Sequence, residues 1–115
     1  VIHDALSGII PRYRALAERG QIELAMTPYA HPIVPLLNDF ENMRCALPDA
    51  PGPDAERYPG GTDRSRWHMQ RGIEVFEQYF GHRPQGVWLS EGGVSADALA
   101  VLDEFDIKWT ASGEG

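Results

Sequence analysis

The chain has 115 residues, of which 43% are hydrophobic and 23% charged, proportions that are ordinary for a globular fold. Its net charge of −7 disfavours nucleic acid as a partner, because nucleic-acid binding needs basic patches, and gives no attraction to an anionic membrane surface. The single cysteine excludes an internal disulfide and a cysteine-based zinc site, and it suits a reducing, cytoplasmic compartment. No apolar run approaches the roughly 18 residues of a membrane-spanning helix, so we expect no membrane partner.

The first predicted element is helical. Apolar residues recur at helical spacing through residues 2–19, with charged residues between them. Pro11 lies inside this stretch and removes a backbone hydrogen bond, so either the helix kinks there or a second helix begins at Pro11 after Gly8. Gly20 is a good C-terminal stop for this region.

A strand is predicted over residues 21–26, where polar and apolar side chains alternate. Glu23 falls on the polar side of this alternation, and a charged residue inside a strand indicates a polar or solvent-filled face. The loop that follows is stiff, because two prolines flank Tyr29 and His31 and restrict the backbone around them.

The rest of the chain continues the alternation of helices and strands. The expected elements are a helical turn at 33–37, a short helix at 38–46, a loop rich in proline and glycine at 47–61, a helix from Thr62 or Asp63 to about Phe80, a strand at 86–90, a helix capped by Ser95 and a strand at 107–111. The residues expected to be buried by the two helices are Met69, Ile73, Phe76, Phe80, Ala98, Leu99, Leu102 and Phe105. This order is typical of an α/β fold with parallel strands and crossover helices.

Polar groups follow each of the three predicted strands. Tyr29 and His31 come after the first, Glu91 after the second, and Ser112 and Glu114 after the third. In parallel α/β folds, ligands bind at the carboxyl ends of the strands. The coincidence therefore predicts an active site at this edge.

Each candidate also has a structural interpretation. Glu91 is either catalytic or a carboxylate that favours the dipole of the helix after it, and His31 is either a site residue or a packed loop residue. Glu23 either pairs with a buried arginine or lies in a pocket. Trp88 and Trp109 are either core residues or platforms for a sugar ring.

Three stretches carry a recognisable pattern: Gly-Gln-Ile-Glu-Leu at 20–24, Thr-Pro-Tyr-Ala-His-Pro-Ile-Val-Pro-Leu-Leu at 27–37, and Val-Trp-Leu-Ser-Glu at 87–91. Together with Lys-Trp-Thr-Ala at 108–111, this ordered set resembles glycoside hydrolase family 57, the α-amylase and α-glucan-transferase family. The resemblance implies a (β/α)7-type barrel that cleaves or transfers α-glucans with retention of configuration.

By position in this pattern, Glu91 would be the catalytic nucleophile, and Glu23, His31 and Trp88 would shape the sugar pocket. A retaining enzyme needs a second carboxyl group about 5–5.5 Å from the nucleophile. The resemblance implies that this acid/base aspartate comes from a region beyond residue 115. It calls for no cofactor or metal, and the expected partner is an α-glucan oligo- or polysaccharide.

The length of the chain fits a segment better than a whole barrel, since α/β barrels typically take about 250 residues. The chain begins at Val1 without an initiator methionine, and the family's first conserved region, with its His-Gln-Pro, is expected before it. We therefore expect residues 1–115 to be one segment of a larger barrel domain. Similar sequences often carry an aspartate where this chain has Gly113, so no role is transferred to the loop of Glu114.

Two other functions stay open. A metal-dependent carbohydrate hydrolase or deacetylase would use His31 with Asp39, although such sites need clustered ligands. A non-catalytic, carbohydrate-binding relative of the barrel would have lost its acid. The sequence does not distinguish hydrolysis from transfer, nor one α-linked sugar from another.

Overall fold

The computed structural model describes residues 2–55 and 57–113. The elements in chain order are α1 (Ile2–Ser7), α2 (Ile9–Glu18), α3 (Val34–Asn38), the 3-10 helix η1 (Phe40–Cys45), α4 (Gly61–Phe80), β1 (Gly86–Trp88), the 3-10 turn η2 (Ser90–Gly92), α5 (Ala96–Glu104) and β2 (Trp109–Ala111). Glu114, one of the polar groups expected after the last strand, lies outside the described residues. None of the helices in the described part of the chain has the length and apolar character needed to cross a membrane.

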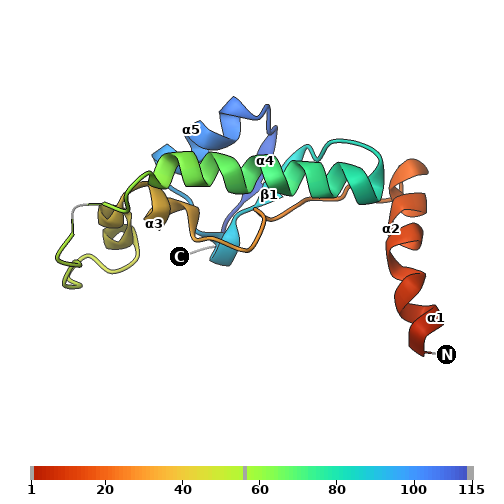
Figure 1. The fold of residues 1–115 in the computed structure, drawn as a ribbon, viewed down its shortest axis with the longest axis horizontal. Helices are drawn as coiled ribbons and strands as arrows, with labels where there is room; N and C mark the ends of the chain where they lie inside the picture. Colours follow the sequence, from red (N-terminus) through yellow and green to blue (C-terminus); the bar gives the residue numbers. More distant parts are fainter. Residues whose placement is uncertain (1, 56, 114–115) are drawn as a thin grey trace.

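The long helix α4 runs along the molecule, and the rod formed by α1 and α2 projects from the end where α4 finishes (Figure 1). The break in this rod falls at Gly8, as the second alternative predicted, and α2 begins two residues before Pro11. Pro11 therefore sits in the first turn, where its missing N–H costs no helical hydrogen bond. Gly20, at φ +67°, ends α2 as expected, and the N–H of Gln21 reaches back to the carbonyl of Leu16.

Strand β1 is the centre of the parallel pairing. β2 pairs with it on one side, and on the other side Met26 forms a single parallel bridge, donating its N–H to Gly86 and accepting from the N–H of Trp88. The strand predicted over 21–26 is wrong in extent, because only its last residue pairs. Pro28 ends this ladder, since it has no N–H for the next rung. The parallel order agrees with the predicted α/β class.

Helices α4 and α5 cover one face of these strands. The core consists of Met26, Val34, Met69, Ile73, Phe76, Val87, Leu89, Ala98, Val101 and Leu102. Most of the predicted helix positions are confirmed, and Ser95 caps α5 as expected by accepting the N–H of Ala98. Leu99 is the exception, with 44% of its surface exposed, because it lies on the outer side of α5 while Val101 turns inward.

The start of α4 differs from the expectation that Thr62 or Asp63 would cap it. Gly60 occupies the N-cap position at φ +68°, and no side chain caps the helix. A Cβ atom at Gly61 would lie 1.6 Å from the carbonyl oxygen of Leu37, so only glycine allows the helix to start this close to α3.

Three other predicted elements are shorter than expected. Residues 38–46 do not form one helix, because Asp39 is extended and caps the separate 3-10 helix η1 by accepting the N–H of Glu41. The strand predicted over 86–90 ends at Trp88, where the chain turns into η2. The strand predicted over 107–111 is reduced to the three residues of β2.

Candidate functional site

One face of the sheet is free of helices within the described residues and carries polar and aromatic side chains. Met26 and Val87 point to the helix-covered core, so the residues next to them in each extended segment point to the opposite face. Glu23 is exposed there, and so are Trp88, with 54% of its surface accessible, and Trp109, with 40%. The polar face predicted for the first strand is confirmed, and neither tryptophan is a core residue.

Trp109 and Glu23 meet across the width of this face. The indole Nε1–H of Trp109 donates to Oε1 of Glu23 at 2.6 Å. The ring crosses β1 at Gly86, where a Cβ atom would lie 2.0 Å from the indole. The sequence alone leaves the role of Trp109 open. A useful signal was the glycine at the start of β1, because Gly86 is the register partner of Trp109.

His31 and Glu91 meet at the carboxyl edge of the strands. Nε2 of His31 lies 3.1 Å from Oε1 of Glu91, and the two side chains are 56% and 75% exposed. Since an ionised carboxylate only accepts hydrogen bonds, Nε2 is the donor. Regular alternation would place Glu91 with Val87 and Leu89, against the helices. The turn η2 prevents this, because Glu91 adopts φ +56° and leaves the strand direction.

Non-glycine residues with left-handed backbone are concentrated at this edge. Among the described residues, the non-glycine residues with positive φ are Ala30 at 60°, His31 at 57°, Glu91 at 56° and Asp106 at 59°. Each such residue costs roughly 1–2 kcal/mol relative to ordinary backbone. Strained residues of this kind tend to cluster at functional sites, and three of these four hold the His31–Glu91 pair.

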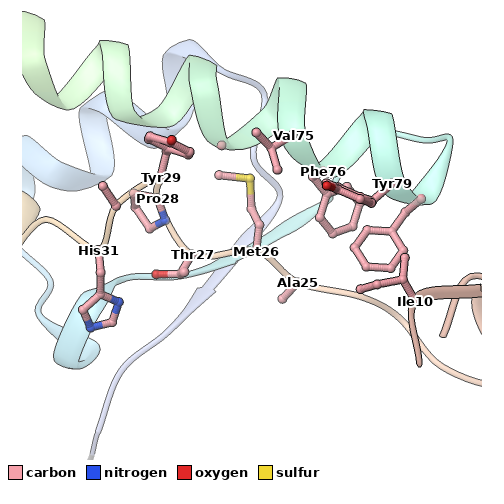
Figure 2. Close-up of a pocket in the computed structure, with 13 residues that line it drawn as sticks. Ile10, Ala25, Met26, Thr27, Pro28, Tyr29, His31, Val75, Phe76 and Tyr79 are labelled. Carbon is pink, nitrogen blue, oxygen red and sulfur yellow. The ribbon is translucent and has the colours of Figure 1, made fainter. Parts of the chain in front are cut away.

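The loop that carries His31 is anchored to α4 by a pair of hydrogen bonds. The N–H of Tyr29 donates to the carbonyl of His68 at 3.1 Å, and Nδ1 of the His68 ring lies 2.6 Å from the carbonyl of Tyr29, which it reaches as a donor. Gly72 permits this approach, since a Cβ atom there would lie 3.2 Å from the Tyr29 nitrogen. Figure 2 shows the result: Tyr29 is directed toward α4, while His31 points away from it. The sequence does not indicate this role for His68, because its spacing is that of a helix-surface residue.

The end of the third strand closes the same edge. Ser112, exposed after β2, and Gly113 pack against Gly92 of η2, where a Cβ atom would lie 3.1 Å from the Gly113 nitrogen. The three predicted strand ends therefore converge. Tyr29 does not join them, because its ring packs edge-on against Trp67 of α4 with 5.8 Å between the ring centres.

A cavity of about 450 Å³ opens between α4 and residues 25–31. Its lining is apolar, including Ile10, Val75, Phe76 and Tyr79, and His31 lies at one end (Figure 2). The sheet face with Glu23 and the two tryptophans combines hydrogen-bonding and apolar side chains to a greater extent than this cavity does.

The residues proposed for a metal site have separate partners. His31 contacts Glu91, whereas Asp39 accepts the N–H of Glu41 at the start of η1. Within residues 2–55 and 57–113, no group of three or more histidine, cysteine, aspartate and glutamate side chains is placed to hold a metal ion.

The family model of glycosyl hydrolase family 57 matches residues 2–114, and because the match covers nearly the whole chain, the chain belongs to this family. Membership makes it a glycoside hydrolase sequence, and it implies a carbohydrate substrate. Neither the comparison with curated proteins nor that with solved structures finds a match.

Proposed function

We propose that residues 1–115 are a segment of a (β/α)7-type barrel of a retaining glycoside hydrolase or transglycosidase that acts on α-glucans, with Glu91 as its nucleophile. The observation that carries the proposal is the position of Glu91, an exposed carboxylate in a left-handed turn directly after the central strand. Carboxyl ends of parallel strands are where such barrels place catalytic groups. The single free cysteine, Cys45, favours a cytoplasmic location.

In this proposal the chemistry proceeds in two displacements. A carboxylate oxygen of Glu91 attacks the anomeric carbon, while an acid protonates the departing glycosidic oxygen, and a glycosyl ester forms on Glu91. The residue that acted as the acid then acts as a base and removes a proton from water or from an acceptor sugar. The deprotonated oxygen attacks the anomeric carbon and releases Glu91. Among the described residues, Glu91 bonds only to His31, so we place the acid/base aspartate elsewhere in the protein.

The other residues expected at the site have distinct proposed tasks. The N–H of His31 holds Oε1 of Glu91, and within the described residues Oε2 has no donor, which leaves that oxygen to attack. Trp88, half exposed at the end of β1, offers an apolar surface to a sugar ring. Glu23 accepts hydrogen bonds from sugar hydroxyls on the open face.

The test uses the full-length protein with Glu91→Gln and Glu91→Ala. We expect kcat on α-glucans to fall by about 10³-fold or more. We also expect azide to restore turnover of an activated α-glucoside by Glu91→Ala, with the β-glycosyl azide as product, because the small anion takes the place of the missing nucleophile. Glu77→Gln, an exposed carboxylate on α4, is the control and keeps full activity.

A mechanism-based α-glucoside inactivator provides an independent check, since peptide mapping identifies the labelled carboxylate. A label on Glu91 supports the proposal, and a label on another residue refutes the assignment. Full turnover by Glu91→Gln on every α-glucan tried would also refute it. A protein that binds glucan but takes no label would be the non-catalytic relative.

A further inference from the structure

We propose that Trp109 is a further residue of the sugar pocket, where it positions the carboxylate of Glu23 toward sugar hydroxyls and forms part of the pocket floor. This inference rests on the proposed function, because it assumes that the open face of the sheet binds carbohydrate. It concerns a residue to which the family resemblance assigned no role.

The first observation is the hydrogen bond itself. An indole has a single donor, Nε1–H, and in Trp109 that donor is directed at Oε1 of Glu23 at 2.6 Å, across 86 residues of sequence. A carboxylate acceptor makes this a charge-assisted bond, which is stronger than a neutral one. The bond leaves the second oxygen of Glu23 on the exposed face, where it can accept from a ligand hydroxyl.

The second observation is the path that the indole takes. Trp109 belongs to β2 and Glu23 to the extended segment on the other side of β1, so the ring must cross the central strand. It does so over Gly86, whose Cβ atom would lie 2.0 Å from the ring if it had one. A glycine at this register position is therefore what allows the indole to lie across the sheet.

The third observation concerns the side chains that share the open face with the indole of Trp109. Trp88 points to the same open face two residues after Gly86, and both indoles are about half exposed. Aromatic faces beside a carboxylate suit a pyranose ring, which presents apolar C–H groups on one side and hydroxyls at its rim. The pocket floor that we propose consists of Trp88, Trp109 and Glu23, and it lies below the edge that carries Glu91.

The rival explanation is that the bond merely fastens residues 21–26 to the sheet. The two explanations differ in what Trp109→Phe does, because phenylalanine keeps an aromatic ring and removes the N–H. We would measure the Kd of maltopentaose by calorimetry in the full-length Glu91→Gln background, with Trp109→Phe, Glu23→Gln and both together. Trp67→Phe, an exposed tryptophan on α4, is the matched control.

We expect Trp109→Phe to weaken maltopentaose binding about tenfold, the effect of losing a hydrogen bond to a charged group. The double variant should bind no more weakly than Glu23→Gln alone, because Trp109 acts through Glu23. Trp67→Phe should bind as the parent does. Two results would overturn the inference. One is that the losses in binding free energy of Trp109→Phe and Glu23→Gln add up in the double variant. The other is that Trp109→Phe binds maltopentaose as the parent does and only its melting temperature falls.

A second measurement covers the case in which Trp109→Phe does not fold. In ¹⁵N-labelled full-length protein, the Nε1–H signal of Trp109 should shift in Glu23→Gln and shift again when maltopentaose is added to the parent. A Trp109 Nε1–H signal that does not shift when maltopentaose is added overturns the inference. The proposed function fails separately: full activity of Glu91→Gln refutes the nucleophile, whereas an inactive Glu91→Gln with parental sugar binding by Trp109→Phe refutes only the role of Trp109.

Discussion

Nε2 of His31 and Oε1 of Glu91 lie 3.1 Å apart although 60 residues separate them in the sequence. Both residues adopt left-handed backbone, at φ 57° and 56°. The contact therefore joins two strained loops, one after Met26 and one after β1, and each loop helps to hold the other. If Glu91 is the nucleophile, as proposed, a carboxylate held in this way would need little reorganisation in the reaction.

His31→Ala should reduce kcat/KM on α-glucans by about 10- to 100-fold, because small displacements of a reacting group are costly. The loss should fall mainly on kcat, since the hydrogen bond positions the proposed nucleophile. His31→Asn keeps a donor and tolerates left-handed backbone, so it should retain more activity than His31→Ala. His3→Ala, at a side chain that is 93% exposed, is the control. Equal kinetics for His31→Ala and His3→Ala would show that the contact plays no part in the reaction.

His68→Phe should loosen the loop that carries His31, because it removes the ring N–H that reaches the carbonyl of Tyr29. We expect the free energy of unfolding to fall by about 1 kcal/mol, the typical net value of one hydrogen bond. Hydrogen exchange of residues 27–31 should become faster, and urea denaturation gives the stability. His3→Phe, at a side chain that is 93% exposed, should change neither. Unchanged exchange in His68→Phe would mean that α4 does not anchor the loop.

Gly86→Ala should displace the indole of Trp109, whose ring lies 2.0 Å from the position of the new Cβ atom. We expect a loss of about 1–3 kcal/mol in unfolding free energy, as for other overpacked sites. Gly93→Ala is the matched control, because its backbone is at φ −69° and its Cβ atom would find neighbours no closer than 3.5 Å. Chemical denaturation compares the two, and equal stabilities would contradict the packing described for Trp109.

Arg66 joins α4 to α5 through two hydrogen bonds to the carboxylate of Glu104, at 2.7 and 2.8 Å. The hydrogen bonds from Arg66 lower the pKa of Glu104, with a smaller contribution from the charge itself. A lowered carboxyl pKa adds stability above the unfolded value of 4.5, and this stability is lost as pH falls through the lower folded pKa. Glu104→Gln should therefore flatten the fall in melting temperature below about pH 4.5. Asp103→Asn, at an exposed neighbouring residue, is the control and should leave that fall unchanged. The same fall in melting temperature below about pH 4.5 for Glu104→Gln and for the parent would contradict the prediction.

Local patterns predicted the helices well, because their burial depends on residues three and four apart. Met69, Ile73 and Phe76 are buried as expected, and Gly20 and Ser95 end and begin helices where their chemistry favours it. The convergence of strand ends also follows from chain order, and His31 and Glu91 do meet there.

Other features depend on contacts between distant residues, which no local pattern contains. The side on which Glu91 emerges is decided by the left-handed turn after β1, and the face chosen by Trp109 is decided by its crossing over Gly86. His68 has the spacing of a surface residue, and its bond to Tyr29 exists only because α4 packs against that loop. The extent of the first strand was overestimated because alternation alone does not provide a pairing partner.

The helix-covered face of the sheet and the open face belong to the same strands, but substitutions on the two faces differ in their effect on stability. The core lies on the first, so replacing Val87 or Leu89 threatens the fold as a whole. The open side makes little contribution to that core, so exchange of an exposed aromatic ring there leaves the core packing in place. Under the proposed function, substitutions at Trp88 and its neighbours would therefore alter sugar preference while the scaffold stays intact.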